Sequence, residues 1–212
     1  MRLAAFVCAL LPFTVAFAAD APSISGRVVG ADGKGIAEAV VFVETPVPPA
    51  VAGAQATMDQ INKTFVPGLL PIVVGTNVIF PNHDQIHHHV YSFSRTKSFE
   101  LPLSKGEDAP PVLFDKVGVV KVGCNIHDWM SGIILVLPTP YFAVTDAEGQ
   151  FAFNDLPRGT YKLAAWHAQS KAKPEDTIQS IAVNGAGAQA NFTLALTPVR
   201  ARPAMHGVRG EP

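Results

Sequence analysis

The sequence predicts an all-β protein, and three observations carry this prediction. Apolar and polar residues alternate over many short segments, and Gly and Pro residues interrupt the chain between these segments. No window shows the sustained 3.6-residue period of an amphipathic helix. With 212 residues, of which 48% are hydrophobic and 16% charged, the chain can form the packed cores of one large or two small domains.

The first 19 residues are typical of a secretory signal peptide. Arg2 precedes an apolar stretch, residues 3–17, and Ala18 ends an Ala-x-Ala cleavage site. The stretch is too short and too interrupted for a membrane span, so we expect cleavage, export to the periplasm and no membrane span in the mature protein. Cys8 is removed with the signal. Cys124 is then the only cysteine of the exported chain, which therefore has no internal disulfide.

Residues 20–46 and 139–197, at the two ends of the chain, each contain patterns that predict short strands. Asp32-Gly33, between alternating apolar runs, predicts a hairpin that joins strands at residues 23–29 and 39–44. Pro46 stops the second strand. Later strands are expected at residues 141–144, 150–153, 161–166, 177–183 and 189–196. Residues 198–212, rich in Pro, Gly and Arg, are expected to form a disordered tail.

Residues 47–138 predict a second unit built from short strands. We expect these strands at residues 55–60, 64–67, 72–74, 77–81, 88–94, 98–101, 111–114, 117–123 and 132–137. Short strands at this spacing favour a sandwich or a barrel. The last two strands are the most apolar, so the loop from Cys124 to Met130 should join two central strands.

That loop holds Cys124, His127 and Met130 within seven residues. A thiolate, an imidazole and a weak thioether are the ligand types of an electron-transfer copper site. A lone thiol in an oxidising compartment is a liability unless it is buried or metal-bound. Ligand spacing favours the metal over an inert buried cysteine. A second nitrogen ligand is still required, and the best source is the run His87-His88-His89.

Strand alternation places these three histidines on two faces. His88 shares its face with Val90, whereas His87 and His89 share the other face with two aromatic residues. Both His88 and His89 are candidates, the second because its face carries the larger apolar groups. His83 and His87 are expected to be solvated.

The segment Cys124-x-x-His127-x-x-Met130, between two apolar strands, resembles the ligand loop of the cupredoxins, at the spacing of the short-loop, amicyanin-like members. Upstream, His88-His89-Val90 resembles the His-Asn-Val of that family, with His89 where Asn is usual. The resemblance covers roughly residues 54–138. It implies a cupredoxin-like Greek-key sandwich with one mononuclear type 1 copper site. The implied ligands are His88, Cys124, His127 and Met130, the last as a weak axial ligand.

Two further resemblances concern the whole chain. Asn-His-Asp at residues 82–84, together with residues 123–130, is similar to exported bacterial proteins labelled methylamine utilization proteins. The segments around Gly26 and around Gly159-Thr160-Tyr161 resemble a carboxypeptidase-regulatory-like (transthyretin/Ig-like) β-sandwich. Such pieces normally lie close together in sequence. The resemblance therefore implies that the copper domain is inserted into a loop of this accessory sandwich, which an exposed turn tolerates.

The expected function is periplasmic single-electron transfer, without enzymatic activity, between redox partners such as a c-type cytochrome or a periplasmic dehydrogenase. By family analogy, His127 is the electron exit. One alternative is a copper carrier or storage protein, which His83, His87 and His89 favour. Another is a structural interaction module. The net charge of −1 gives no reason to expect nucleic acid as a partner.

Overall fold

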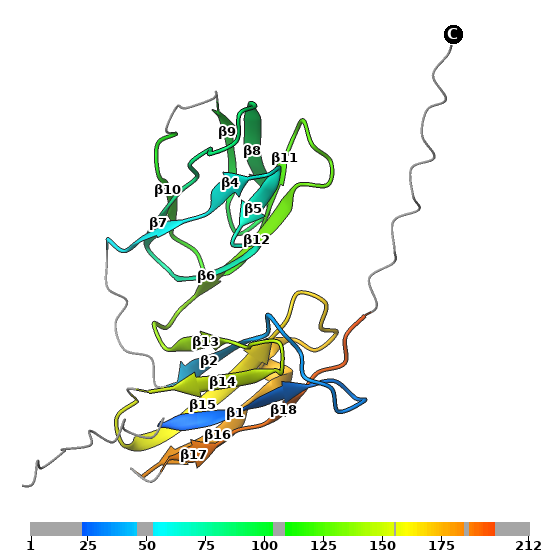
Figure 1. Ribbon diagram of the computed structural model, residues 1–212. Coiled ribbons are helices and arrows are strands. Elements are labelled where there is room, and N and C mark those ends of the chain that lie inside the picture. The colour runs from blue at the N-terminus through cyan, green and yellow to red at the C-terminus, as the bar shows by residue number, and fades with distance from the viewer. Residues whose placement is uncertain (1–22, 46–52, 104–108, 155, 185–186, 198–212) are drawn as a thin grey trace, which may run out of the picture.

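The structure, a computed structural model, describes residues 23–45, 53–103, 109–154, 156–184 and 187–197. Within these ranges the chain forms 18 strands and one short 3-10 helix, η1 (Pro174–Thr177). The strands form two groups, one above the other in Figure 1. The prediction of an all-β sandwich fold is confirmed. No helix in the described ranges has the length and apolarity that a membrane crossing requires. The predicted signal peptide and C-terminal tail lie outside the described residues.

The lower group in Figure 1 is a two-sheet sandwich built from both ends of the described chain, and we call it the flanking sandwich. One sheet has the order β14-β1-β17, with β18 also paired to β1, and consists of β1 (Ile24–Val29), β14 (Gln150–Phe153), β17 (Ala188–Gln189) and β18 (Phe192–Thr193). The other has the order β13-β2-β15-β16 and consists of β2 (Val40–Thr45), β13 (Phe142–Val144), β15 (Gly159–Trp166) and β16 (Gln179–Val183). Ile24, Val41 and Leu163 belong to the buried core that the two sheets share.

The upper group contains β3 to β12, and we call it the central sandwich. Its three-stranded sheet has the order β10-β7-β3 and consists of β3 (Gln55–Thr57), β7 (Thr76–Ile79) and β10 (Val112–Phe114). Its five-stranded sheet has the order β6-β12-β11-β8-β9 and consists of β6 (Leu69–Val73), β8 (His88–Phe93), β9 (Ser98–Leu103), β11 (Gly118–Cys124) and β12 (Ser131–Leu137). The strands β4 (Asp59–Ile61) and β5 (Thr64–Val66) form a separate two-stranded sheet, and Gln60 of β4 also makes an isolated parallel bridge to Asn82. Cys124 and Met130 lie in the same buried core as Phe80 and Ile134.

The loop that carries the predicted ligands joins β11 to β12. These two strands pair antiparallel from Gly118 opposite Val136 to Gly123 opposite Ser131. The other side of β11 pairs with β8, and the other side of β12 pairs in parallel with β6. The loop therefore connects two interior strands of the sheet, as predicted.

The second half of β12 is buried on both faces because two cores share it. Ile134 and Val136 point into the central sandwich, while Leu135 and Leu137 point toward the flanking sandwich. The uninterrupted apolar run of residues 133–137 is the pattern of a strand covered on both sides. We call the cluster between the sandwiches the interface core; its buried members are Val40, Phe42, Leu135, Leu137 and Ala164.

The hairpin predicted between the first two strands is wrong. The turn at Asp32-Gly33 forms, with Gly33 at a φ of 77°. However, β1 pairs with β14, β17 and β18, whereas β2 pairs with β13 and β15. Ile36 and Ala39, between the two strands, are buried in the core of the sandwich. Burial of these side chains takes the chain from one sheet across to the other.

Three of the predicted strand ranges contain more than a single strand or begin in a 3-10 helix. Residues 55–60 contain parts of two strands, β3 and β4, because the fully buried Met58 separates them. Residues 189–196 likewise hold the end of β17 and all of β18. The start of the strand predicted at residues 177–183 is instead the end of η1, whose first helical residue is Pro174.

Candidate metal centre

Strand pairing brings His88 and Cys124 together. In the antiparallel pair of β8 and β11, Cys124 lies opposite Val90. Side chains alternate along β8, so His88 and Val90 point to the same inner face. His88 is 2% exposed and Cys124 is 3% exposed. Their side chains meet inside the central sandwich, where Cys124 Sγ lies 3.7 Å from His88 Nδ1.

The loop after β11 folds back on its own start. The N–H of Met130 donates to the carbonyl of His127 at 2.9 Å, and the N–H of Cys124 donates to the carbonyl of Met130 at 3.2 Å. A third bond, from the N–H of Asn125 to the carbonyl of His89 at 3.1 Å, ties the loop to β8. In this conformation His127 Nδ1 lies 3.6 Å from Cys124 Sγ.

Three donor atoms therefore converge on one place. The ligand atoms of His88, Cys124 and His127 all lie within 4.8 Å of one another, and no other such group of three occurs among the described residues. Nitrogen and sulfur donors at about 2.0–2.3 Å from a single ion, in trigonal to tetrahedral geometry, lie about 3.4–3.8 Å apart. The sulfur–nitrogen separations of 3.6 and 3.7 Å fall in this range. The three side chains fit one small, thiophilic metal ion.

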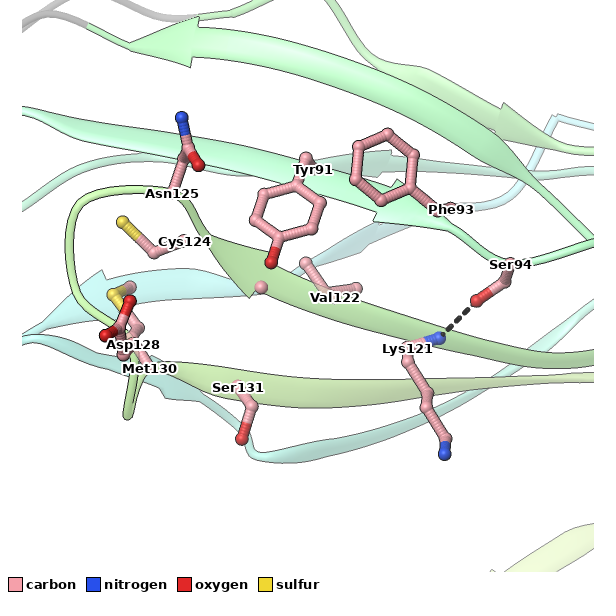
Figure 2. A pocket seen from close by; sticks show the side chains of 11 residues that line it. Tyr91, Phe93, Ser94, Lys121, Val122, Cys124, Asn125, Asp128, Met130 and Ser131 are labelled. Atoms are coloured by element: carbon pink, nitrogen blue, oxygen red, sulfur yellow. Dashed lines mark hydrogen bonds between the residues drawn. The ribbon is translucent and has the colours of Figure 1, made fainter.

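Met130 is the candidate for a weak fourth ligand. It is 2% exposed and belongs to the same buried cluster as Cys124. Figure 2 shows the sulfur atoms of both residues beside the loop that joins β11 to β12. A thioether near a thiolate and two imidazoles is the donor set of an electron-transfer copper site.

His127 is held in the neutral form that binds metals. Burial lowers the pKa of its imidazole, His88 and Lys63 lower it further, and Asp84 opposes them. The ring is half-buried, with its centroid 5.0 Å from that of His88 and 5.4 Å from that of Trp129. A neutral imidazole near pH 7 offers a free lone pair, so a metal does not have to displace a proton there.

A carboxylate fixes the orientation of His88. The ring donates its Nε2–H to Asp84 Oδ2 at 2.8 Å. In a neutral imidazole this leaves Nδ1, the atom that faces Cys124, without a proton. Burial raises the pKa of Asp84, but hydrogen bonds from the N–H of Lys63, from His88 and from the N–H of Asn62 outweigh it and hold that pKa below its usual value. The carboxylate is therefore charged at neutral pH.

His89, the second candidate from the sequence, lies outside the cluster. Its Nε2 lies 2.8 Å from Glu100 Oε1, at ion-pair distance but without the alignment of a hydrogen bond. Tyr91 and Phe93, which share its face of β8, lie on the outer side of the sheet, and Phe93 is 79% exposed. The larger apolar groups therefore did not mark the inner face. The geometry favours His88 as the upstream ligand.

The remaining upstream histidines are also outside the cluster. His83 is largely exposed, and its Nδ1 lies 2.7 Å from Asp59 Oδ2. His87 is exposed. Both positions agree with the prediction of solvated residues.

The surface around the loop combines apolar side chains with an open cavity. Trp129 is 58% and Ile126 55% exposed. A cavity of about 520 Å³ lies beside the loop, and its walls include Tyr91, Lys121 and Asp128 as well as the two sulfur residues (Figure 2). Neither of the candidate ligand histidines, His88 and His127, lines it. The cavity therefore lies beside the candidate metal centre, on the side of Cys124 and Met130.

The sequence did not predict the residues that hold His88. Asp84 stands in the Asn-His-Asp segment noted above, and a carboxylate four residues before a candidate ligand was the available signal. Asn62 and Lys63 contribute through their backbone N–H groups. Their residue types therefore gave no signal.

The chain matches no protein-family model and no curated protein. Among solved structures it is similar to the copper-containing nitrite reductase of Thermus scotoductus SA-01, with 30% identity and a TM-score of 0.37 over 42% of this chain and 25% of the reductase. It is also similar to a reduced amicyanin variant and to the Cu(I) form of another amicyanin variant, each with 22% identity and a TM-score of 0.37 over 46% of this chain and 98% of amicyanin. The chain thus spans about a quarter of the length of the nitrite reductase that it matches.

Proposed function

We propose that this protein is a type 1 (blue) copper protein that carries single electrons between redox partners and catalyses no reaction of its own. The observation that carries the proposal is the convergence of Cys124 Sγ with one nitrogen each of His88 and His127, at separations that suit one ion. The buried thioether of Met130 beside them completes the donor set of an electron-transfer copper site.

Each residue of the site has a separate role. Copper, when bound, accepts and releases one electron. Cys124 supplies the thiolate, and Asp84 holds the His88 ring so that Nδ1 is available. Backbone hydrogen bonds within the loop fix His127 and Met130 relative to Cys124. Because strands and loop already hold these groups, little rearrangement is needed when the charge of the ion changes.

His127 is the proposed point of electron exit. It is half-buried, while the other candidate nitrogen ligand, His88, is buried inside the central sandwich. The neighbouring side chains of Ile126 and Trp129 are exposed and apolar, which suits transient contact with a partner.

The proposed setting is the periplasm, reached through the signal peptide of residues 1–19. Suitable partners are a c-type cytochrome or a periplasmic dehydrogenase. In the proposed domain division, residues 47–138 form the copper domain inserted into an accessory sandwich of residues 20–46 and 139–197. The flanking sandwich supports this division because its strands come from both ends of the described chain.

Copper titration tests the function. The purified protein should bind one Cu(II), become intensely coloured through thiolate-to-copper charge transfer, and be reduced and reoxidised reversibly. Cys124→Ser should abolish the colour, because the charge-transfer donor is removed. His83→Ala, which removes a histidine outside the cluster, should leave it unchanged.

The same titration separates the alternatives. A colourless protein that binds only Cu(I) would instead indicate a copper carrier or storage protein. A protein that binds neither Cu(II) nor Cu(I) would rule out both metal functions and leave a structural module.

A further inference from the structure

We propose that Asp84 and the tip of the β4–β5 hairpin form a positioning unit for the ligand His88. The inference rests on the proposed copper function and adds residues that do not themselves touch the metal. The two strands pair from Asp59 opposite Val66 to Ile61 opposite Thr64, which leaves Asn62 and Lys63 as the tip. The tip lies against the loop that carries Asp84, as its hydrogen bonds show.

Both oxygens of the Asp84 carboxylate are occupied. Oδ1 accepts the N–H of Asn62 at 2.5 Å, and Oδ2 accepts the N–H of Lys63 at 2.7 Å. Oδ2 also accepts the Nε2–H of His88 at 2.8 Å. The side chain of Asp84 is only 11% exposed and that of His88 is fully buried, so water competes weakly for these bonds. One carboxylate thus joins the hairpin backbone to the imidazole.

The loop before β8 holds Asp84 in place from its own side. The N–H of Asp84 donates to Asn82 Oδ1 at 3.0 Å, and Asn82 Nδ2 donates to the carbonyl of Ile86 at 2.9 Å. The carboxylate is therefore fixed by its own loop as well as by the hairpin.

The backbone of the hairpin tip is shaped to receive an anion. Asn62 and Lys63 have φ values of 54° and 57°, the left-handed conformation at both central positions of a two-residue turn. Asn tolerates this conformation, but Lys adopts it rarely. Successive N–H groups in such a turn point into one concavity that binds anions, and Asp84 fills it. The carboxylate compensates for a backbone conformation that lysine otherwise avoids.

This arrangement couples the hairpin to the electronic state of the copper. A carboxylate that accepts the second ring N–H fixes the orientation of a ligand histidine and raises the basicity of its metal-binding nitrogen. Its negative charge also favours the more positive, oxidised ion. Loss of Asp84 should therefore weaken Cu(II) binding more than Cu(I) binding, and the protein should become easier to reduce.

Asp84→Asn tests the unit, and Asp59→Asn is a matched control. The amide of Asp84→Asn offers one acceptor oxygen to three donors, and no charge. Asp59 belongs to the same hairpin and pairs with an imidazole at 2.7 Å, but that imidazole belongs to His83, outside the cluster. We expect Asp84→Asn to weaken Cu(II) binding about 10- to 100-fold, to raise the reduction potential and to shift the charge-transfer band. Asp59→Asn should change none of these.

The copper-free protein provides an independent measurement. Proton NMR should detect a slowly exchanging Nε2–H of His88 in the wild type and in Asp59→Asn, and this signal should be lost in Asp84→Asn. Amide hydrogen exchange at Asn62 and Lys63 should become about tenfold faster in Asp84→Asn. Suppose that the Nε2–H signal of His88 and the slow amide exchange at Asn62 and Lys63 both persist in Asp84→Asn. The positioning unit is then ruled out, whether or not copper binds. If both behave as expected while no form binds copper, the copper function fails and the positioning of His88 stands.

One measurement needs no variant, and so remains informative if Asp84→Asn does not fold. Because coupling between sites is reciprocal, copper loading of the wild type should slow amide exchange at Asn62 and Lys63. Unchanged exchange at these two amides on copper binding would overturn the proposal.

Discussion

Two buried polar residues, Thr145 in the flanking sandwich and His88 in the central sandwich, use their hydrogen-bonding atoms in opposite ways. In the flanking sandwich, the buried hydroxyl of Thr145 donates to the carbonyl of Ile36 at 2.6 Å and accepts the N–H of Ala39 at 2.9 Å. In the central sandwich, His88 uses one ring nitrogen for Asp84 and turns the other toward the thiol of Cys124. A buried hydroxyl such as that of Thr145, which both donates and accepts a hydrogen bond, stabilises the fold. Adjacent buried groups that keep their lone pairs instead form a site for an ion.

The sandwiches also differ in what lies against their glycines. A Cβ added to Gly26 in β1 would lie 1.7 Å from the carbonyl oxygen of Ala190, which is backbone. A Cβ added to Gly123 in β11 would meet the ring end and hydroxyl of Tyr91 at 3.0 Å. The first contact cannot relax without separating the chain segments, while the second involves the far end of a side chain.

The largest effect is therefore expected for Gly26→Ala. The added methyl group must push β1 away from the segment of Ala190, and we expect the free energy of unfolding to fall by about 3–5 kcal/mol. Urea unfolding followed by circular dichroism measures this loss.

Gly123→Ala makes the same chemical change next to the metal centre. Because the ring of Tyr91 can shift, the expected loss is only about 1–2 kcal/mol. Equal losses in the two variants would contradict the distinction between backbone and side-chain contacts.

Substitutions in β12 should separate stability from the metal centre. Leu135→Ala removes volume from the interface core and should lower the free energy of unfolding by about 2–4 kcal/mol. The copper charge-transfer band should not change, because Leu135 points away from Cys124.

Ile134→Ala is the matched change on the opposite face of the same strand. It should lower the free energy of unfolding by a similar amount. It also loosens the buried cluster that contains Cys124 and Met130, so the copper charge-transfer band should shift or broaden. A shifted band in Leu135→Ala together with an unchanged band in Ile134→Ala would reverse the assignment of the two faces.

The smallest effect concerns pH and the flanking sandwich. Burial lowers the pKa of His167, with Glu38 opposing, and the ring Nδ1 accepts the N–H of Gln169 at 3.1 Å. The unfolded chain therefore binds the proton more readily than the folded protein. The stability that His167 contributes is present above its ordinary pKa of about 6.5 and is lost as the pH falls through the window below that value.

Urea unfolding of the copper-free protein between pH 7.5 and 5.5 measures this dependence. His127, whose pKa is also lowered by burial, contributes in the same direction. His167→Asn keeps an acceptor for Gln169 but cannot be protonated, so its pH dependence should be shallower than that of the wild type. If the free energy of unfolding changes equally with pH in the wild type and in His167→Asn, His167 does not contribute to the pH dependence.

The part of the candidate metal centre that is local in sequence could be predicted from the sequence alone. Cys124, His127 and Met130 lie in one short loop, and backbone bonds within that loop bring them together. His88 is distant in sequence, but the two-residue period of β8 placed it on one of two faces. The choice between the faces required burial, since the aromatic residues lie on the outer face.

The features that the sequence did not predict depend on contacts between segments that are distant in sequence. The turn at Asp32-Gly33 was predicted correctly, but a turn does not determine whether the next strand stays in the same sheet. The buried side chains of Ile36 and Ala39 decided that outcome. The partner of Asp84 is likewise a pair of backbone N–H groups, which become neighbours of the carboxylate only in the folded chain.

The interface core limits how this protein can be divided in the laboratory. A fragment of residues 53–137 would retain the candidate metal ligands and lose the cover over the outer face of its sheet. Leu69, Val119, Leu135 and Leu137 would then form a contiguous apolar strip in water, of the kind that promotes self-association. The central sandwich on its own therefore needs polar replacements at these outward positions. The inward residues Ile134 and Val136 of the same strand must be kept.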